Sequence, residues 1–343
     1  MKLNFRLILF PFTVLYALIM ELRNFVYDKQ ILKSEKFEIP IINVGNLSVG
    51  GTGKTPQIEY LIRLLQKNYK IAVISRGYKR KTKGFIVADE SSTPETIGDE
   101  PYQIFHKFHP IIVAVGEDRV KAIRKVLAKF HPDVILLDDA FQHRRVQAGL
   151  NLLLTPYQTP FFNDFVLPAG NLREGRKNAK RADLVVVTKS SNELTDHQRD
   201  LYRKKIHLYT DAPVFFSHIV YDDKIYNNKS IFLLHELTSY EVLLVTGIAN
   251  PHPLYSFLSE KNINFDSLKF GDHHYFSKED VKHIKKVFEK INNEKKIILT
   301  TEKDFVRLHR HFEKDLYYLP IQTEIFENEV FNNKILDYVS NKK

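Results

Sequence analysis

Cysteine and tryptophan are absent from this sequence of 343 residues, and methionine occurs only twice. The absence of cysteine excludes disulfide bonds, thiolate zinc sites, iron–sulfur clusters and a cysteine nucleophile. The uncharged run at residues 7–20 is shorter than the roughly 20 residues that a membrane-spanning helix needs, and it contains Pro11. With 43% hydrophobic and 27% charged residues, the composition is that of a globular protein and not of a polytopic membrane protein. The length predicts about two domains.

Acidic residues are fewer than basic ones: the sequence contains 41 Asp and Glu and 51 Lys and Arg. A surface with this excess attracts phosphates, anionic lipid headgroups or nucleic acid. The charge alone does not choose among these ligands. No recognisable nucleic-acid motif accompanies it, so nucleic-acid binding is not predicted.

The N-terminal apolar run has more than one interpretation. It is either a helix buried in the core or a helix in the membrane interface, where Lys2, Arg6 and Arg23 would reach lipid phosphates. A cleaved signal peptide is disfavoured, because residues 21–25 offer no small-residue cleavage site. The run by itself leaves the first two interpretations open.

The first two thirds of the chain alternate short β-branched runs with helical or loop stretches, which predicts a parallel α/β sheet. The helix at 55–66 carries apolar residues on one face. The predicted strands are 39–44, 71–75, 111–115, 134–137, 150–154 and 184–188.

The remainder of the chain predicts a connection and a second α/β unit. Runs at 214–220 and 230–234 flank a polar turn at 226–229 and predict a hairpin that joins the domains. The second unit is predicted to contain strands 242–246 and 296–301 and helices 254–261 and 277–291, the last capped by Ser277. The expected division is 1–30 for the N-terminal helix, 31–212 for a nucleotide-binding catalytic domain, 213–234 for the linker and 235–343 for a smaller domain.

A phosphate-binding loop follows the first predicted strand and precedes a helix, which is the context that such a loop requires. Its glycines would let backbone N–H groups surround phosphates, Lys54 would reach the β- and γ-phosphates, and the Thr55 hydroxyl would bind Mg²⁺. Ser48 stands where the first glycine is usual, so a positive φ at that position is an open question. The predicted nucleotide-binding residues are Ser48, Val49, Gly50, Gly51, Thr52, Gly53, Lys54 and Thr55.

Two carboxylates, Asp138 and Asp139, follow the buried run 134–137. Asp138 is predicted to join the Mg²⁺ shell, although both residues are also compatible with capping the segment that follows. Neither 188–191 nor 301–304 carries the Asn-Lys-x-Asp order that is typical of guanine recognition. ATP is therefore the predicted nucleotide. The predicted class of protein is a P-loop nucleotide enzyme or switch.

Seven motifs taken in order resemble the tetraacyldisaccharide 4′-kinase family, which phosphorylates a lipid A precursor in Gram-negative bacteria. The resemblance covers nearly the whole chain and rests on residues 48–56 (SVGGTGKTP), 75–78 (SRGY), 98–101 (GDEP), 137–143 (LDDAFQH), 167–174 (LPAGNLRE), 272–274 (DHH) and 301–304 (TEKD). It implies a P-loop NTPase fold with a smaller C-terminal α/β domain that closes over the active site. It also implies transfer of the ATP γ-phosphate, with Mg²⁺, to the 4′-hydroxyl of tetraacyldisaccharide 1-phosphate.

The resemblance also implies residue roles. A sugar hydroxyl is a weak nucleophile, and Asp99 is expected to accept its proton with support from His273, while Lys54 and Asp139 complete the catalytic set. Glu100 is expected to join Thr55 and Asp138 around the metal. Alternatives remain: Asp99 as a turn residue before Pro101, Glu100 as a solvated carboxylate, and His274 in place of His273. The expected substrate-binding residues are Arg76, Tyr78, Arg119, Asn171, Arg173 and Glu174.

The expected location is the cytoplasmic face of the inner membrane, with a peripheral or monotopic attachment through the N-terminal helix. The expected partners are the acylated disaccharide lipid and an anionic membrane surface, and the expected state is a monomer. The competing interpretation is a membrane-associated P-loop regulatory ATPase, which explains the loop and the positive charge but leaves Asp99, Glu174 and His273 without a role.

Overall fold

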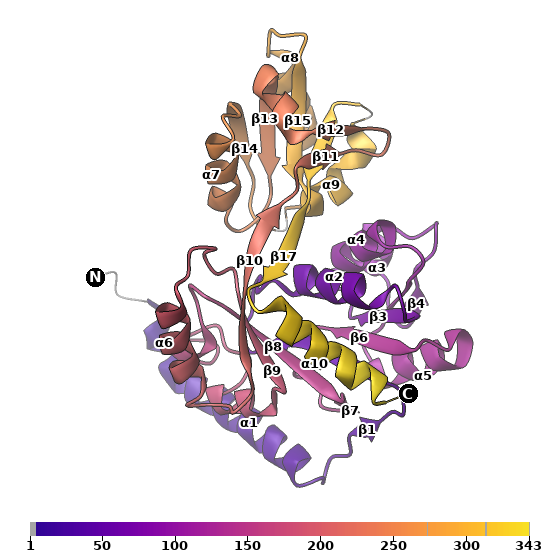
Figure 1. Ribbon diagram of the computed structural model, residues 1–343, viewed down its shortest axis with the longest axis vertical. Helices are drawn as coiled ribbons and strands as arrows, with labels where there is room; N and C mark the ends of the chain where they lie inside the picture. Colours follow the sequence, from indigo (N-terminus) through magenta and orange to yellow (C-terminus); the bar gives the residue numbers. More distant parts are fainter. Residues whose placement is uncertain (1–4, 273, 313, 343) are drawn as a thin grey trace.

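The computed structural model describes residues 5–272, 274–312 and 314–342 and contains two main β-sheets, one above the other in Figure 1. Neighbouring strands of the larger sheet are parallel except at its two edges, where β17 and β4 run antiparallel to their neighbours. The spatial order is β17 (Ile321–Ile325), β10 (Val214–Tyr221), β9 (Leu184–Thr188), β8 (Leu150–Pro156), β2 (Ile41–Asn46), β6 (Val134–Asp138), β3 (Ile71–Ser75), β5 (Ile112–Val115) and β4 (Ile86–Val87). The α/β class with parallel sheets, predicted from the sequence, is thereby confirmed.

Helices cover both faces of this sheet. The apolar face that α2 buries packs on one side of the sheet together with α4 and α10, and α5 packs on the other side. The strands of a parallel sheet are continuous apolar runs in the sequence because both faces of the sheet are buried, which is why the sequence predicts them well. The helices are α2 (Lys54–Leu65), α3 (Pro94–Ile97), α4 (Asp99–Lys107), α5 (Arg119–Phe130), α6 (Asp196–Ile206) and α10 (Asn328–Ser340), with 3₁₀ turns η2 (Phe161–Asn163) and η3 (Arg176–Arg181). A separate two-stranded pair joins β1 (Glu35–Lys36) to β7 (Val146–Gln147).

The smaller sheet has its own core, with α7 on one side and α8 and α9 on the other. Its strand order is β12 (Ile231–Leu233), β11 (Lys224–Tyr226), β16 (Leu316–Leu319), β15 (Lys296–Thr301), β13 (Glu241–Thr246) and β14 (Phe265–Lys269). Its helices are α7 (His252–Glu260), α8 (Lys278–Glu289) and α9 (Glu302–Leu308), with 3₁₀ turns η4 (Leu234–Ser239) and η5 (His309–His311). Ser277 caps α8 as predicted, because its hydroxyl accepts from the Asp280 N–H.

The connection between the sheets differs from the predicted hairpin. The hairpin arms are β11 and β12, whereas β10 pairs with β9 on one side and with β17 on the other. The prediction that the run 214–220 forms a hairpin arm is therefore wrong, because its apolar residues are used in the large sheet. In Figure 1, β10 leads up to the smaller sheet and β17 leads back down.

Helix α10 packs against the large sheet. Phe331, Ile335 and Val339 of α10 are fully buried in the core beside α2. Together with β17, this segment lies with the larger sheet, although the sequence pattern predicts that it belongs to the smaller domain. Helical periodicity shows which face of a segment is buried and does not show against which sheet it packs.

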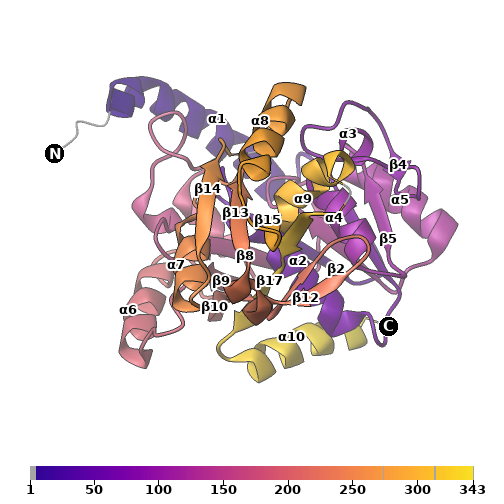
Figure 2. The same ribbon diagram turned by 90° about the horizontal axis from the view of Figure 1, so that it is seen from above.

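The N-terminal helix α1 (Phe10–Asp28), preceded by η1 (Phe5–Leu9), has an inverted pattern of burial. Its polar residues Thr13 and Asn24 are buried against the protein, whereas Leu18 and Leu22 are more than 60% exposed. The interpretation as a buried core helix is therefore wrong. In Figure 2, α1 and α10 lie on opposite sides of the molecule. Within the described residues, no helix is both long enough and apolar enough to cross a membrane.

Candidate active site

The phosphate loop joins the end of β2 to the start of α2. Gly53, directly before α2, has φ = 87° and Gly50 has φ = 102°, a region that side chains other than glycine rarely adopt. Ser48 is not among the described residues with positive φ, and it forms a β-bridge with Leu172 instead. The missing glycine at position 48 is therefore compatible with the loop, because the turns that require glycine lie at 50 and 53.

Two neighbouring segments hold the loop in place. The Val49 N–H donates to the Asn171 carbonyl over 2.8 Å. On the other side, the Thr188 hydroxyl donates to the Thr52 carbonyl over 2.8 Å, and Lys189 Nζ donates to the Gly51 carbonyl over 2.6 Å. The last two bonds use the carbonyl oxygens at positions 52 and 51, which a phosphate cannot bind, because a phosphate oxygen accepts hydrogen bonds and does not donate them.

Lys54 and Arg173 share one carboxylate. Lys54 Nζ lies 3.8 Å from Asp139 Oδ1, and Arg173 contacts both oxygens of Asp139, at 2.8 and 3.0 Å. Burial pushes the pKa of Asp139 upwards, but the two cations outweigh it and the pKa is lowered overall. Asp139 is therefore ionised, and it holds two cations at the N-terminus of α2, where negative phosphates are favoured.

Asp138 ends β6 and is buried. Its Oδ2 accepts a 2.9 Å hydrogen bond from Ser75, whereas its buried Oδ1 has no hydrogen-bond partner within the described residues. Burial, followed by the neighbouring carboxylates Glu100 and Asp139, raises the pKa of Asp138 to about 7. A buried carboxylate oxygen without a donor is an arrangement that a divalent cation would stabilise.

Asp99 and Glu100 open helix α4. A close approach of Gly98 and Gly77, where a Cβ on Gly98 would lie 3.1 Å from the Gly77 Cα, brings the SRGY and GDEP motifs together. Asp99 accepts from Arg307 of α9, with Nε 3.1 Å from Oδ2. His273, the predicted support of Asp99, lies outside the described residues. The carbonyl of the next residue, His274, accepts a 3.1 Å bond from Arg307.

The predicted substrate-binding arginines occupy different environments. Arg119 is 3% exposed and donates to the Gly116 carbonyl over 2.7 Å. Burial lowers its pKa to about 10, against the attraction of Asp138. Arg76, by contrast, is exposed, and so is Tyr78, whose ring lies 5.8 Å from the Lys79 ammonium. Arg119 is therefore buried within electrostatic range of Asp138, whereas Arg76 and Tyr78 are open to solvent.

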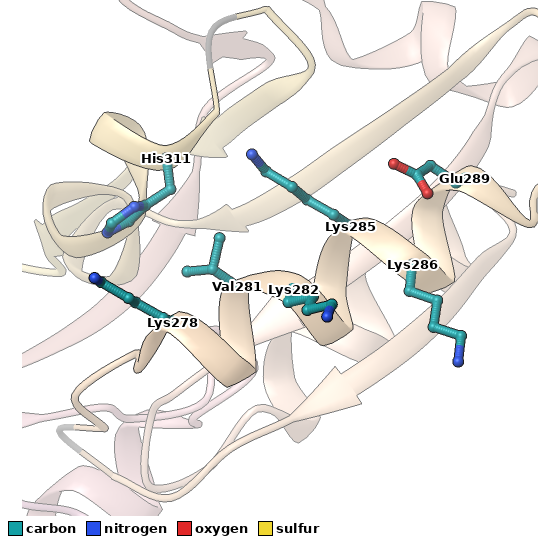
Figure 3. A pocket seen from close by; sticks show the side chains of 7 residues that line it. All are labelled: Lys278, Val281, Lys282, Lys285, Lys286, Glu289 and His311. Carbon is teal, nitrogen blue, oxygen red and sulfur yellow. The ribbon is translucent and has the colours of Figure 1, made fainter.

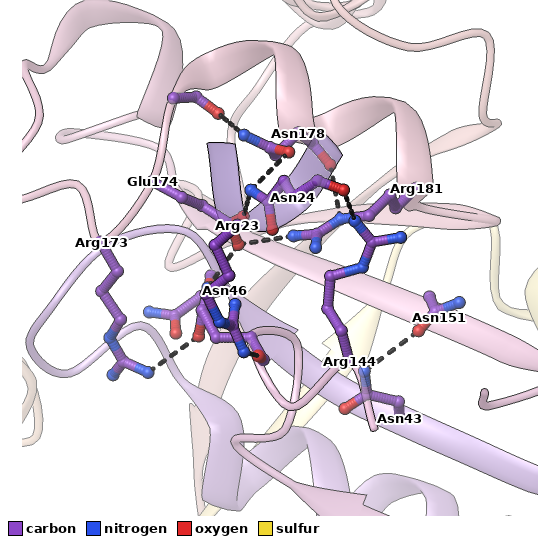
Figure 4. Close-up of polar contacts among 12 residues, drawn as sticks. Arg23, Asn24, Asn43, Asn46, Arg144, Asn151, Arg173, Glu174, Asn178 and Arg181 are labelled. Atoms are coloured by element: carbon purple, nitrogen blue, oxygen red, sulfur yellow. Dashed lines mark hydrogen bonds and ion pairs between the residues drawn. The ribbon is translucent and has the colours of Figure 1, made fainter. Parts of the chain in front are cut away.

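Glu174 is fully buried in a network that ties the N-terminal helix to the site (Figure 4). Its carboxylate accepts from Asn24 at 2.9 Å, from Gln142 at 2.9 Å and from Arg181 at 2.5 Å. The neighbouring Asn171 bonds to Asp164 through its side chain. The contacts of Glu174 are those of an anchor between α1 and the segment 171–181.

Three cations near the site were not among the predicted residues. Lys189 follows β9, Lys303 follows β15, and Arg307 lies one helical turn further on. Burial lowers the pKa of Lys189 and of Lys303, and Asp272 opposes the shift in both. Lys189 directly follows a strand of the larger sheet, and positions directly after parallel strands meet at one edge of a sheet, which was the available signal for this residue. Lys303 lies on α9 beside the smaller sheet, so this signal did not apply to it. Arg307 offered no such signal.

A hollow elsewhere among the described residues does not share this convergence of site residues. A hollow of about 490 Å³ along α8 is lined mainly by lysines and contains none of the predicted site residues (Figure 3). In the part of the chain that the structure describes, no group of three His, Cys, Asp or Glu side chains is placed to hold a metal by itself.

Comparisons with known proteins identify close relatives. A protein-family model described as tetraacyldisaccharide-1-P 4′-kinase matches residues 5–340. The tetraacyldisaccharide 4′-kinase of Flavobacterium johnsoniae is 49% identical over 97% of both chains, and that of Bacteroides thetaiotaomicron is 42% identical over 96% of this chain and 92% of its own. A crystal structure of LpxK from Aquifex aeolicus in complex with ATP shares 32% identity and a TM-score of 0.81, covering 97% of this chain and 99% of that one.

Proposed function

The chain belongs to the tetraacyldisaccharide-1-P 4′-kinase family, and from that premise we propose how its residues perform the reaction. The protein is an ATP-dependent kinase of lipid A biosynthesis. It transfers the ATP γ-phosphate to the 4′-hydroxyl of tetraacyldisaccharide 1-phosphate. The alternative of a regulatory ATPase is not favoured, since relatives along the full length are kinases.

The main support for these roles is that Lys54 and Arg173 both contact the Asp139 carboxylate at the start of α2. ATP would place its phosphates against the backbone N–H groups of 50–55 and the ammonium of Lys54. Arg173 and Lys189 flank the same loop and would balance the charge that develops on the transferred group. The pairing of both Lys54 and Arg173 with Asp139 holds them ready for this role.

Asp99 is the proposed proton acceptor. The 4′-oxygen bonds to the γ-phosphorus, the bond from that phosphorus to the β,γ-bridging oxygen breaks, ADP leaves, and the hydroxyl proton passes to the Asp99 carboxylate. Glu100, the next residue, lies near enough to Asp138 to raise its pKa, which supports placing Asp99 at the edge of the phosphate site.

Asp138 and Thr55 fit a Mg²⁺ site, and Glu100 is the third residue that we assign to it. The buried Oδ1 of Asp138, which has no hydrogen-bond partner among the residues that the structure describes, supports this, as does its position beside the phosphate loop. Bound Mg²⁺ would neutralise charge on the β- and γ-phosphates. The contribution of this chain is the buried carboxylate, which Ser75 orients by its hydrogen bond.

The exposed apolar face of α1 would lie in the membrane interface at the cytoplasmic face of the inner membrane, a peripheral attachment that brings the acylated substrate to the site. The support is the inverted burial of α1 and its direct contacts with the site segment: the Tyr16 hydroxyl donates to the Arg173 carbonyl over 3.0 Å. One chain supplies every residue assigned here, so a monomer suffices.

We divide the chain between its two sheets. The unit of the larger sheet would hold the phosphate loop, and the unit of the smaller sheet, from β11 to β16, would close over it by bending at β10 and β17. The support is that β10 and β17 are the paired strands through which the chain enters and leaves the smaller sheet.

The test is lipid phosphorylation by the purified protein with Mg²⁺, γ-labelled ATP and detergent-dispersed tetraacyldisaccharide 1-phosphate. We expect Asp99→Asn to lower lipid labelling by about 10²- to 10⁴-fold, the usual contribution of a general base, while ATP binding persists. The matched control is Asp211→Asn, which makes the same change on an exposed residue. Near-normal labelling by Asp99→Asn would refute the role of Asp99 as the base.

A further inference from the structure

One cation from the unit of the smaller sheet contacts the proposed base, Asp99. Arg307 of α9 places Nε 3.1 Å from Asp99 Oδ2, and its Nη2 contacts the same oxygen. The side chains are only 11% and 21% exposed, so solvent screens the pair weakly. The two residues are 208 positions apart and belong to the units of different sheets.

We propose that Arg307 is a positioning residue for the phosphotransfer: it fixes the Asp99 carboxylate by one oxygen and presents the other, Oδ1, to the acceptor hydroxyl. This inference rests on the proposed role of Asp99. Both guanidinium contacts fall on Oδ2 and therefore do not use the lone pairs of Oδ1. Two N–H donors from one planar guanidinium restrict the position of Oδ2 more than a single contact would.

Arg307 is itself held rigidly. Its Nη1 donates to the His274 carbonyl over 3.1 Å and lies 3.7 Å from the buried Asp304 carboxylate. Asp304 in turn accepts from the Gly247 N–H and from the Thr301 hydroxyl, both at 2.8 Å. The guanidinium thus connects the start of α4 with the segment at 274 and with the framework of the smaller sheet.

The contact between Asp99 and Arg307 also depends on how the two units are arranged. Asp99 lies on α4 of the larger unit and Arg307 on α9 of the smaller one, so the pair exists only when these helices are docked. Movement of the smaller unit would therefore change the orientation of the proposed base as well as the access of water. This links closure to catalysis through one ion pair.

A second ion pair between the same helices provides a matched control. Lys107 of α4 bonds to Glu302 of α9, with Nζ 2.7 Å from Oε1. This pair holds the docking of α4 on α9 and makes no contact with Asp99 among the described residues. Glu302→Gln therefore changes a contact between the same two helices without touching Asp99, whereas Arg307→Ala and Arg307→Lys test the contact with Asp99.

The experiment measures kcat and KM for ATP and for lipid in these three variants, in Asp99→Asn, and in the Arg307→Ala/Asp99→Asn double variant. We expect Arg307→Ala to lower kcat by about 10- to 100-fold, as misplacement of a catalytic group does, with KM for ATP nearly unchanged. Arg307→Lys should lie between it and the wild type, and Glu302→Gln should stay within about twofold. In the Asp99→Asn background, replacing Arg307 with alanine should lower kcat only slightly further, because the two residues act as one unit.

Several results would overturn the proposal: an Arg307→Ala kcat within twofold of the wild type, an equal loss in Glu302→Gln, or full additivity in the double variant. If Asp99→Asn is inactive while Arg307→Ala is active, the base assignment stands and only the positioning role fails. Near-normal turnover by Asp99→Asn would overturn both. Thermal unfolding with and without ATP checks folding, and if Arg307→Ala does not fold, Arg307→Lys decides, because it keeps the charge but not the two contacts.

Discussion

Asn24 of the N-terminal helix donates a 2.9 Å hydrogen bond to Glu174, a residue 150 positions later that is fully buried. The same carboxylate neutralises Arg181, whose burial lowers its pKa. This pair fixes α1 to the segment that contacts the phosphate loop, so the helix proposed to meet the membrane and the proposed site are parts of one structure.

Removal of this anchor should destabilise the protein strongly. Glu174→Ala leaves the Arg181 guanidinium buried without its carboxylate, and we expect a loss of about 3–5 kcal/mol in the free energy of unfolding. Denaturant unfolding measures it. The control is Glu21→Ala, an exposed residue of α1 that bonds to Asn178 in the same network and should change stability by no more than about 0.5 kcal/mol. Equal effects of the two variants would contradict the anchor role.

The ammonium of Lys54 should matter for transfer rather than for folding. Arg173 still pairs with Asp139 in Lys54→Ala, so no buried charge is stranded. We expect lipid phosphorylation to fall by about 10²- to 10³-fold, as when one donor to a transition-state charge is removed, with the thermal unfolding temperature nearly unchanged. Lys67→Ala, an exposed lysine just beyond the other end of α2, is the control. Turnover within a few-fold of the wild type would exclude the assigned role.

The apolar face of α1 should set membrane binding. Leu18 is 62% exposed, and Leu18→Glu removes its apolar contact and adds a negative charge facing anionic lipid. Loss of a leucine contact and repulsion of one charge together predict about 10- to 100-fold weaker binding to phosphatidylglycerol-containing vesicles, measured by cosedimentation. Asn68→Glu adds the same charge at an exposed site away from α1. If both variants bind vesicles equally well, α1 is not the membrane contact.

The pH dependence of stability should carry a contribution from Glu302. Burial and the neighbouring Glu59 raise its pKa from 4.5 to about 7, against the attraction of Lys107. A raised carboxyl pKa stabilises the fold below the unfolded-state pKa near 4.5, and this contribution is lost as the pH rises through about 7. Glu302→Gln keeps the neutral form, so its unfolding free energy should fall less between pH 5 and pH 8, by up to roughly 3 kcal/mol.

Denaturant unfolding at the two pH values tests this, with Glu289→Gln, an exposed glutamate of α8, as the reference. Parallel pH profiles for wild type and Glu302→Gln would show that Glu302 is ionised in the folded protein at both values.

The sequence by itself determined the local elements and the chemistry of the phosphate loop. Strands 71–75, 184–188 and 296–301 match β3, β9 and β15 residue for residue, because buried parallel strands are continuous apolar runs. The family and its kinase activity were also predicted from motifs. The neighbourhood of Lys54 and Asp139 followed from two strands that end at the same edge of one sheet, which adjacent β2 and β6 satisfy.

Only the tertiary structure decided which distant elements meet. The pairing of β10 with β17 and the packing of α10 beside α2 depend on the partner available in space, which the periodicity of a segment does not encode. The same holds for Glu174, placed with the substrate from its motif and found buried among Asn24, Gln142 and Arg181. Arg307 has no local signature at all, because its contact with Asp99 is created by the docking of one sheet's helix on another's.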